Sequence, residues 1–65
     1  MKPERIISAL GGYAPVASAL GSTPKAVYMW TRNGVPHKWH APLRRLARAK
    51  RIAARDVDAA LEWRP

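Results

Sequence analysis

Residues 16–30 of this chain read VASALGSTPKAVYMW, and this stretch decides the fold. Apolar side chains recur at helical spacing in both halves, at Val16 and Leu20 in the first and at Val27 and Trp30 in the second. Three residues that begin with a glycine separate the halves, and such a turn joins the two helices of a helix-turn-helix. The stretch therefore predicts two short helices that meet at a tight turn.

The residues around this turn each meet a separate steric demand. Ala17 is small where the second helix crosses the first, and Gly21 allows the positive φ angle that the turn requires. Thr23 is suited to accept a backbone N–H bond as an N-cap, and Pro24 follows at the first helical position, where its missing N–H costs nothing. We therefore expect a helix-turn-helix motif over about residues 13–32.

Glycine and proline residues divide the flanking sequence into further short helical segments. The first expected helix covers about residues 3–10. The next begins near Pro15 and stops before Gly21. The helix after the turn ends at about residue 32 or 33, where Gly34 is expected to take the left-handed conformation. No segment alternates long enough to suggest a strand.

Two more helices are expected toward the C-terminus. The first is expected to reach about Lys50 and has apolar residues at i, i+4, i+7 and i+8, namely Trp39, Leu43, Leu46 and Ala47. Pro42 leaves two alternatives for its start: the helix begins only near Ala41, or it begins at about His37 and loses one early hydrogen bond. The last helix is expected at about residues 56–63, with Asp56 as its N-cap.

Length and composition limit the chain to one domain and exclude most enzyme classes. The 65 residues predict an all-α fold, a compact bundle of about five short helices, in a single domain over residues 1–65. The absence of cysteine excludes disulfides, thiolate nucleophiles and Cys-ligated zinc. The serines have no base and orienting group around them, and the four acidic residues form no catalytic pair. We therefore expect no enzymatic activity and no cofactor.

Metal binding and membrane insertion are not expected either. His37 and His40 are spaced i and i+3, but no third ligand completes a metal set around them. No run approaches about 18 apolar residues, and the N-terminus lacks the apolar region of a secretory signal. These features favour a cytoplasmic protein with no membrane partner.

The charge is strongly positive and unevenly distributed. Twelve Lys and Arg residues against four Asp and Glu give a formal net charge of +8. Residues 37–55 hold seven of the basic residues and no acid, whereas residues 56–65 are net acidic. Because such an excess repels itself in a compact fold, a polyanion is the first partner to consider. The alternative is a solvated basic surface.

The predicted helix after the turn has an informative outer face. The inward face is expected to hold Ala26, Val27 and Trp30. The outward stripe at i, i+3, i+4 and i+7 then consists of Lys25, Tyr28, Met29 and Arg32. In a DNA major groove, the basic side chains reach guanine O6 and N7, and the other two pack on thymine methyl groups or sugar edges. The alternative is that Tyr28 and Met29 pack against the following helix or a partner subunit.

The basic segment predicts contacts of a second kind, with phosphates. If its helix persists, four arginines at i, i+4, i+7 and i+11 line one edge, namely Arg44, Arg48, Arg51 and Arg55. We assign phosphate contacts to five basic residues of this segment, which are Lys38, Arg44, Arg45, Arg48 and Arg51. The alternative is a solvated helix face.

The segment from Ile6 to Val57 resembles the small Cro-type helix-turn-helix regulators, which include the all-helical phage Cro proteins and the bacterial YdaS-like group. The matching residues are MKPE at 1–4, VASALG at 16–21, TPKAVYMW at 23–30 and GVP at 34–36, followed by the spacing of Trp39 and Leu43. The resemblance implies a lambda-repressor-like fold whose recognition helix faces DNA with Thr23, Pro24, Lys25, Tyr28, Met29 and Arg32. It also implies binding as a dimer to a short, roughly palindromic operator. Ser22 departs from the pattern, which usually has an apolar residue after the turn glycine.

Together these features predict a DNA-binding transcriptional regulator, most simply a repressor that occupies double-stranded DNA as a homodimer and is nucleoid-associated. One alternative is an architectural DNA-binding protein with weak sequence preference, which the charge of residues 37–55 favours. Another alternative is an antitoxin whose main partner is a toxin protein and which uses DNA binding for autoregulation.

Overall fold

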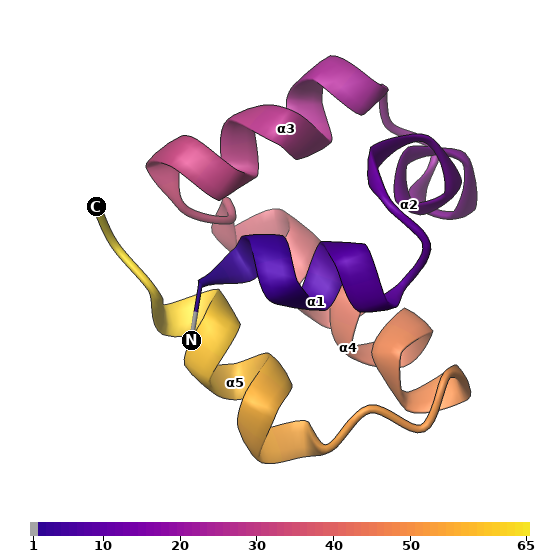
Figure 1. Ribbon diagram of the computed structural model, residues 1–65, viewed down its shortest axis with the longest axis vertical. Helices are drawn as coiled ribbons and strands as arrows, with labels where there is room; N and C mark the ends of the chain where they lie inside the picture. Colours follow the sequence, from indigo (N-terminus) through magenta and orange to yellow (C-terminus); the bar gives the residue numbers. More distant parts are fainter. Residues whose placement is uncertain (1) are drawn as a thin grey trace.

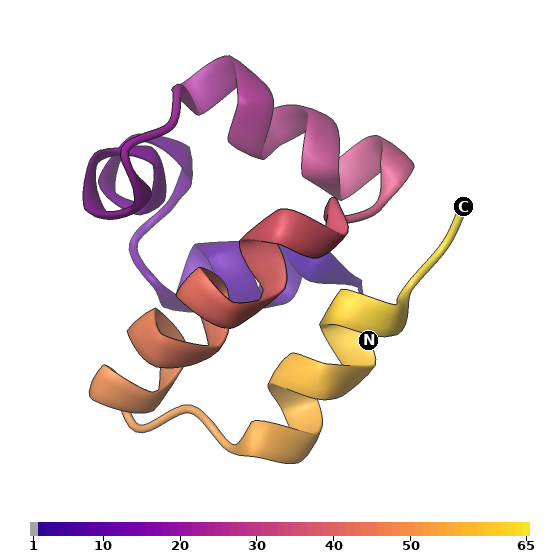
Figure 2. The same ribbon diagram turned by 180° about the vertical axis from the view of Figure 1, so that it is seen from behind.

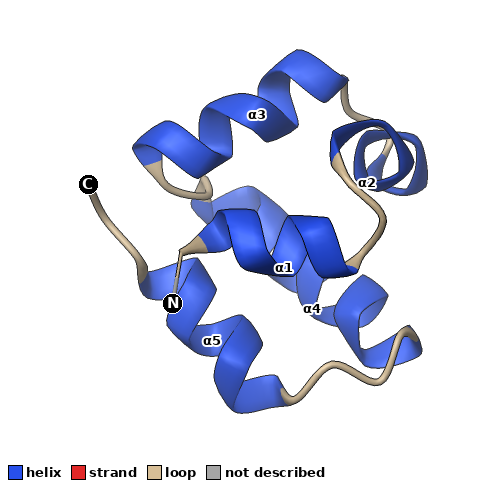
Figure 3. Ribbon diagram, in the orientation of Figure 1, coloured by secondary structure: helices blue, strands red, loops and turns tan. Residues whose placement is uncertain are grey.

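The structure is a computed structural model that describes residues 2–65, and its regular elements are all helical. In chain order the elements are α1 (Pro3–Ala9), α2 (Tyr13–Leu20), α3 (Pro24–Asn33), the single 3₁₀ turn η1 (His37–Trp39), α4 (His40–Ala49) and α5 (Ala54–Glu62) (Figure 3). The expectation of an all-α bundle of about five short helices is confirmed.

Helices α2 and α3 form the upper part of the molecule in Figure 1. There α2 is viewed nearly along its axis whereas α3 lies across the page, so the two helices are not parallel. Gly21 ends α2 at φ 71° and ψ 30°, the left-handed conformation, and the N–H of Ser22 donates to the carbonyl oxygen of Ala17 at 2.8 Å. Helix α2 begins at Tyr13, two residues before the expected Pro15, because proline is accommodated throughout a first turn whose N–H groups lack helical partners.

The start of α3 follows the local signals of the sequence. The Thr23 side chain accepts the Ala26 N–H at 3.2 Å, and Pro24 occupies the first helical position. The prediction that Gly34 takes the left-handed conformation is wrong. Its φ angle of 93° is positive, as expected, but its ψ angle of 157° lies outside the left-handed helical region. A Cβ atom there would lie 3.1 Å from the carbonyl oxygen of Trp63, so the C-terminal tail explains the glycine as much as the helix end does.

The start of the fourth helix was expected either near Ala41 or at about His37, and the structure contains part of each alternative. Helical backbone begins at His37, but as the tighter turn η1, and α4 proper begins at His40. Pro42 then falls in the first turn of α4, where its missing N–H has no helical partner to lose.

The expected N-cap role of Asp56 is wrong. Helix α5 begins at Ala54, its N-cap is Ala53, and the Ala53 carbonyl oxygen accepts the N–H groups of Asp56 and Val57 at 3.1 and 3.2 Å. Asp56 lies in the first turn instead, where its carboxylate is still favourably placed against the helix dipole.

The basic edge expected along one long helix does not form, because α4 ends at Ala49. Arg51 takes a left-handed backbone conformation at φ 61°, and the Ile52 N–H donates back to the Ala47 carbonyl oxygen at 2.9 Å. This is the bonding pattern of a Schellman helix end, with an arginine where glycine is usual. Arg55 consequently belongs to α5 and not to the same helix as Arg44.

Replacing Arg51 by glycine is expected to raise the free energy of unfolding by about 0.5 to 1 kcal/mol, because relief of the left-handed strain outweighs the added chain entropy. The matched control Arg48→Gly removes the same charge inside α4 and is expected to lower stability by about 1 kcal/mol. Urea unfolding followed by circular dichroism measures both. Destabilisation of the same size at both positions would contradict this account of the α4 end.

The core collects one apolar face from each helix. Its buried side chains include Ile7 of α1, Val16 of α2, Val27 of α3, Leu43 of α4 and Leu61 of α5. The rings of Trp30 and Trp39 lie 5.4 Å apart, which joins α3 to η1 and makes Trp39 a packing residue. This core fixes α3 with its remaining face outward.

Candidate nucleic-acid interface

The outer face of α3 carries a continuous exposed stripe of basic, aromatic and thioether side chains. Its four residues, all exposed, are Lys25, Tyr28, Met29 and Arg32. Tyr28 and Met29 are 40% and 41% exposed, whereas Val27 and Trp30 on the inner face are 0% and 4% exposed. The inward and outward positions expected from helical spacing are therefore confirmed.

This stripe lies on a helix at one end of the molecule. In Figure 1 and in the view from behind in Figure 2, α3 crosses the top, and the segment that joins α4 to α5 lies at the bottom. The molecule measures 26 × 25 × 19 Å along its principal axes, and the longest axis runs between these two ends. A ligand that contacts the outer face of α3 therefore meets little else of the molecule besides its neighbours α2 and η1.

Tyr28 is held in place by two neighbours on the same surface. Its ring meets that of Tyr13 from α2 edge to face, with centroids 5.6 Å apart and an interplanar angle of 90°. Arg32 Nη1 donates to the Tyr28 hydroxyl oxygen at 3.3 Å. Tyr28 thus contacts α2 through the ring of Tyr13. The alternative in which Tyr28 and Met29 pack against the fourth helix is wrong, since both side chains stay exposed. Contact of the stripe with a partner subunit stays a prediction.

The first residues of α3 extend the surface. Thr23 and Pro24 are both exposed at the N-terminal end of the helix. Because the Thr23 oxygen only accepts a bond from Ala26, its hydroxyl hydrogen is available to donate to a ligand oxygen. Helix α3 contains no acidic residue, so its N-terminal dipole and its two basic side chains all favour an anion.

The five basic residues assigned to phosphates fall into two groups. Lys38 lies in η1, with its Nζ 5.5 Å from the centroid of the Trp39 ring, and Trp39 in turn packs beneath α3. Arg45 borders a hollow that it shares with Leu20 of α2. These two side chains therefore lie on the same part of the molecule as α2 and α3.

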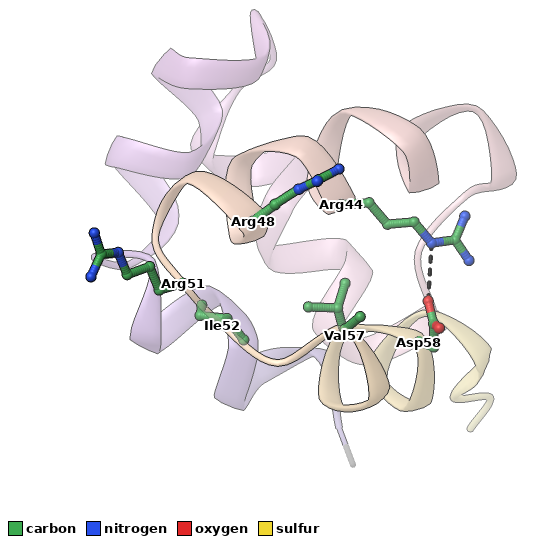
Figure 4. A pocket seen from close by; sticks show the side chains of 7 residues that line it. Arg44, Arg48, Arg51, Ile52, Val57 and Asp58 are labelled. Carbon is green, nitrogen blue, oxygen red and sulfur yellow. Dashed lines mark hydrogen bonds and ion pairs between the residues drawn. The ribbon is translucent and has the colours of Figure 1, made fainter.

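The second group lies away from α3. Arg44 is engaged inside the molecule, since its Nε donates to Asp58 Oδ1 at 3.0 Å. Together with Arg48 and Arg51 it borders a pocket between α4 and α5 (Figure 4). Because Arg51 belongs to the segment at the far end of the longest axis, it does not share a surface with the α3 stripe.

Tyr13, whose ring packs edge to face on Tyr28, was not expected from the sequence as a residue of this surface. The only signal for it was its position at the start of the predicted motif, because a ring in the first turn of α2 reaches the middle of α3. Edge-to-face aromatic pairs add about 0.5–1.5 kcal/mol beyond the area they bury.

We therefore expect Tyr13→Leu to lower the free energy of unfolding, and a double-mutant cycle with Tyr28→Leu to give a coupling energy of about 0.5–1.5 kcal/mol. Thermal or urea unfolding of the four proteins measures it. A coupling energy of zero would show that the two rings do not support each other.

The two histidine rings lie close together, and the ring of His40 has a hydrogen bond within the fold. Their ring centroids are 5.1 Å apart, and His40 Nε2 donates to the Val35 carbonyl oxygen at 2.9 Å. Within residues 2–65, no group of three or more His, Asp or Glu side chains gathers in a way that fits a metal ion. No helix in the same range has the length and apolar character to cross a membrane.

Comparison of the chain with known proteins adds no relative to this description. No family model matches it, and the comparisons with curated proteins and with solved structures find no match either.

Proposed function

We propose that this protein is a helix-turn-helix transcriptional regulator, a repressor that places α3 in the major groove of a short palindromic operator. The observation that carries this proposal is the exposed stripe on α3, in which two large uncharged side chains lie between a lysine and an arginine. Large apolar and aromatic side chains exposed between basic ones fit the mixed surface of base edges in a groove. The resemblance of residues 6–57 to the Cro-type regulators supports the same function.

The chemistry of the stripe assigns a role to each member. Arg32 and Lys25 donate to guanine O6 and N7, and Tyr28 and Met29 pack on thymine methyl groups. The Thr23 hydroxyl, Lys38 and Arg45 donate to backbone phosphates, which holds the helix in register without reading sequence. Arg44, Arg48 and Arg51 are left out of this interface because of their place in the fold.

The size of the molecule favours a dimer on DNA. Its longest dimension, 26 Å, is shorter than the separation of about 34 Å between half-sites one helical turn apart. One copy therefore reads one half-site, and a palindrome requires two copies. Occupancy of a promoter by such a dimer excludes polymerase without a cofactor or catalysis, at the nucleoid in the cytoplasm.

A second candidate is an architectural DNA-binding protein with little sequence preference. The seven basic residues of positions 37–55, with no acid among them, favour it, because phosphate contacts supply affinity without discrimination.

Selection of bound duplexes from a randomised pool at fixed salt separates the two candidates. The repressor predicts enrichment of one short motif in two inverted copies, with centres about ten base pairs apart. Enrichment that follows base composition alone would contradict the repressor and support the architectural protein.

A further inference from the structure

The pocket between α4 and α5 has no role in the proposed function. It has a volume of about 470 Å³ and lies where the C-terminal half of α4, the connecting segment and the first turns of α5 meet (Figure 4). Its lining residues are Arg44, Arg48, Arg51, Ile52, Ala54, Val57 and Asp58.

The pocket combines an apolar floor with a basic rim. Figure 4 shows Ile52 and Val57 between the arginines of α4 on one side and Arg51 at the opposite end. Val57 is buried, and Ile52 is half-buried and packs against the core, so the floor is continuous with the apolar core. The pocket therefore offers an apolar seat with cationic groups around it.

The rim carries charge that the molecule itself does not neutralise. Asp58 pairs with Arg44 at 3.0 Å, and this is the one ion pair formed among residues 2–65. Arg48 and Arg51 are exposed and have no acidic partner in that range. Two cationic side chains next to an apolar floor fit a ligand with carboxylates on either side of an apolar group.

The left-handed backbone at Arg51, which ends α4, lies beside this pocket. Its left-handed conformation suits glycine, and an arginine there carries strain. Strain of this kind persists where the surrounding structure holds it, and it often occurs at binding sites. At Arg51 the strained turn places the residue among those that line the pocket, while Figure 4 shows its guanidinium pointing away from Ile52 and Val57.

The apolar floor of the pocket favours a protein ligand over a nucleic acid. A nucleic-acid backbone has no apolar group to cover Ile52 and Val57, whereas an apolar side chain of a protein does. A second copy of this chain is a poor occupant, because each copy has a net charge of +8 and only four acidic residues, one of which is already paired with Arg44.

We propose that this pocket, the α4–α5 groove, binds an acidic segment of a different protein, with an apolar side chain on Ile52 and Val57 and carboxylates on Arg48 and Arg51. Since the connecting segment and α3 lie at opposite ends of the longest axis, this partner binds without blocking the outer face of α3. The groove would connect a DNA-bound regulator to a second protein. Binding of the acidic segment to the groove does not depend on whether the protein also binds DNA.

The test uses the full chain labelled with nitrogen-15 and a synthetic helical peptide with one leucine face flanked by glutamates. The peptide is expected to shift the backbone amide signals of Arg48, Arg51, Ile52 and Val57. Arg48→Glu with Arg51→Glu is expected to weaken binding by about tenfold or more, because two attractive pairs become repulsive. The matched control Lys2→Glu with Arg5→Glu makes the same charge change at two exposed residues, the N-cap of α1 and a position in its first turn, and is expected to change affinity by less than about twofold.

Four results would overturn the proposal. Equal losses of peptide affinity in the two charge-reversal variants would show that the peptide responds only to the net charge of the protein. Equal binding of a peptide made of glutamate alone would show that the floor is not used. Larger shifts of the groove signals by a duplex of arbitrary sequence would assign the groove to DNA, and concentration-dependent shifts of the same signals without peptide would assign it to a second copy.

Discussion

Replacing Lys25 and Arg32 together by alanine is expected to lower the affinity for a selected operator by about a hundredfold or more, since each contact of this kind contributes about 1–3 kcal/mol. The affinity for arbitrary duplexes is expected to fall much less, because phosphates are held by other side chains. The ratio of the two affinities is therefore the quantity to measure, by fluorescence anisotropy at one salt concentration. Loss of the Arg32 bond also frees the Tyr28 hydroxyl, which adds to the effect.

The matched control removes two positive charges elsewhere. Arg48→Ala with Arg51→Ala changes the net charge by the same amount, at residues of the α4–α5 groove. We expect this variant to keep the full sequence preference and to lose only a few-fold in affinity through long-range electrostatics. Retained preference in the Lys25 and Arg32 variant would remove α3 from the reading role.

Replacing Trp30 by alanine is expected to cost about 3–5 kcal/mol in the free energy of unfolding. The side chain is 4% exposed and packs on Trp39, so its loss opens a cavity where α3 meets η1. The total stability of a domain of this size is of order 3–10 kcal/mol, so this variant is expected to lose a large part of it and to unfold at a markedly lower temperature. Thermal unfolding followed by circular dichroism measures the effect.

Met29→Ala on the same helix is the control for this prediction. Met29 is 41% exposed, and its truncation is expected to change stability by no more than about 0.5 kcal/mol. Similar stability losses at Met29 and Trp30 would contradict the division of α3 into an inner and an outer face. The same Met29 variant is expected to bind its operator more weakly, which separates binding from folding.

Local sequence signals predicted the turn before α3 and the start of α3, which is the helix proposed to read DNA. Thr23, Pro24 and Gly21 each act within a few residues of their own position, and for that reason the start of α3 and the turn before it were predictable. The inner and outer faces of α3 followed from helical periodicity.

The remaining features depend on contacts between elements that are distant in sequence. The backbone angles of Gly34 depend on the approach of the C-terminal tail, and η1 depends on the packing of Trp39 against Trp30. The end of α4 near Lys50 was predicted, but the left-handed turn at Arg51 was not, because sequence alone gives no turn signal for an arginine.

The position of the basic residues in space likewise depends on contacts that the sequence does not reveal. Seven basic residues in positions 37–55 indicated an anionic partner, but only the fold separates Lys38 and Arg45 near α2 and α3 from the arginines of the α4–α5 groove. One basic segment thus contributes to two surfaces.

The most direct test of the central claim is a map of backbone amide shifts when the labelled protein binds the duplex enriched in the selection. We expect the largest changes on residues 23–32, with smaller ones at Lys38 and Arg45. Largest changes at Arg48, Arg51 and Ile52, with α3 unaffected, would contradict the claim that α3 reads the DNA.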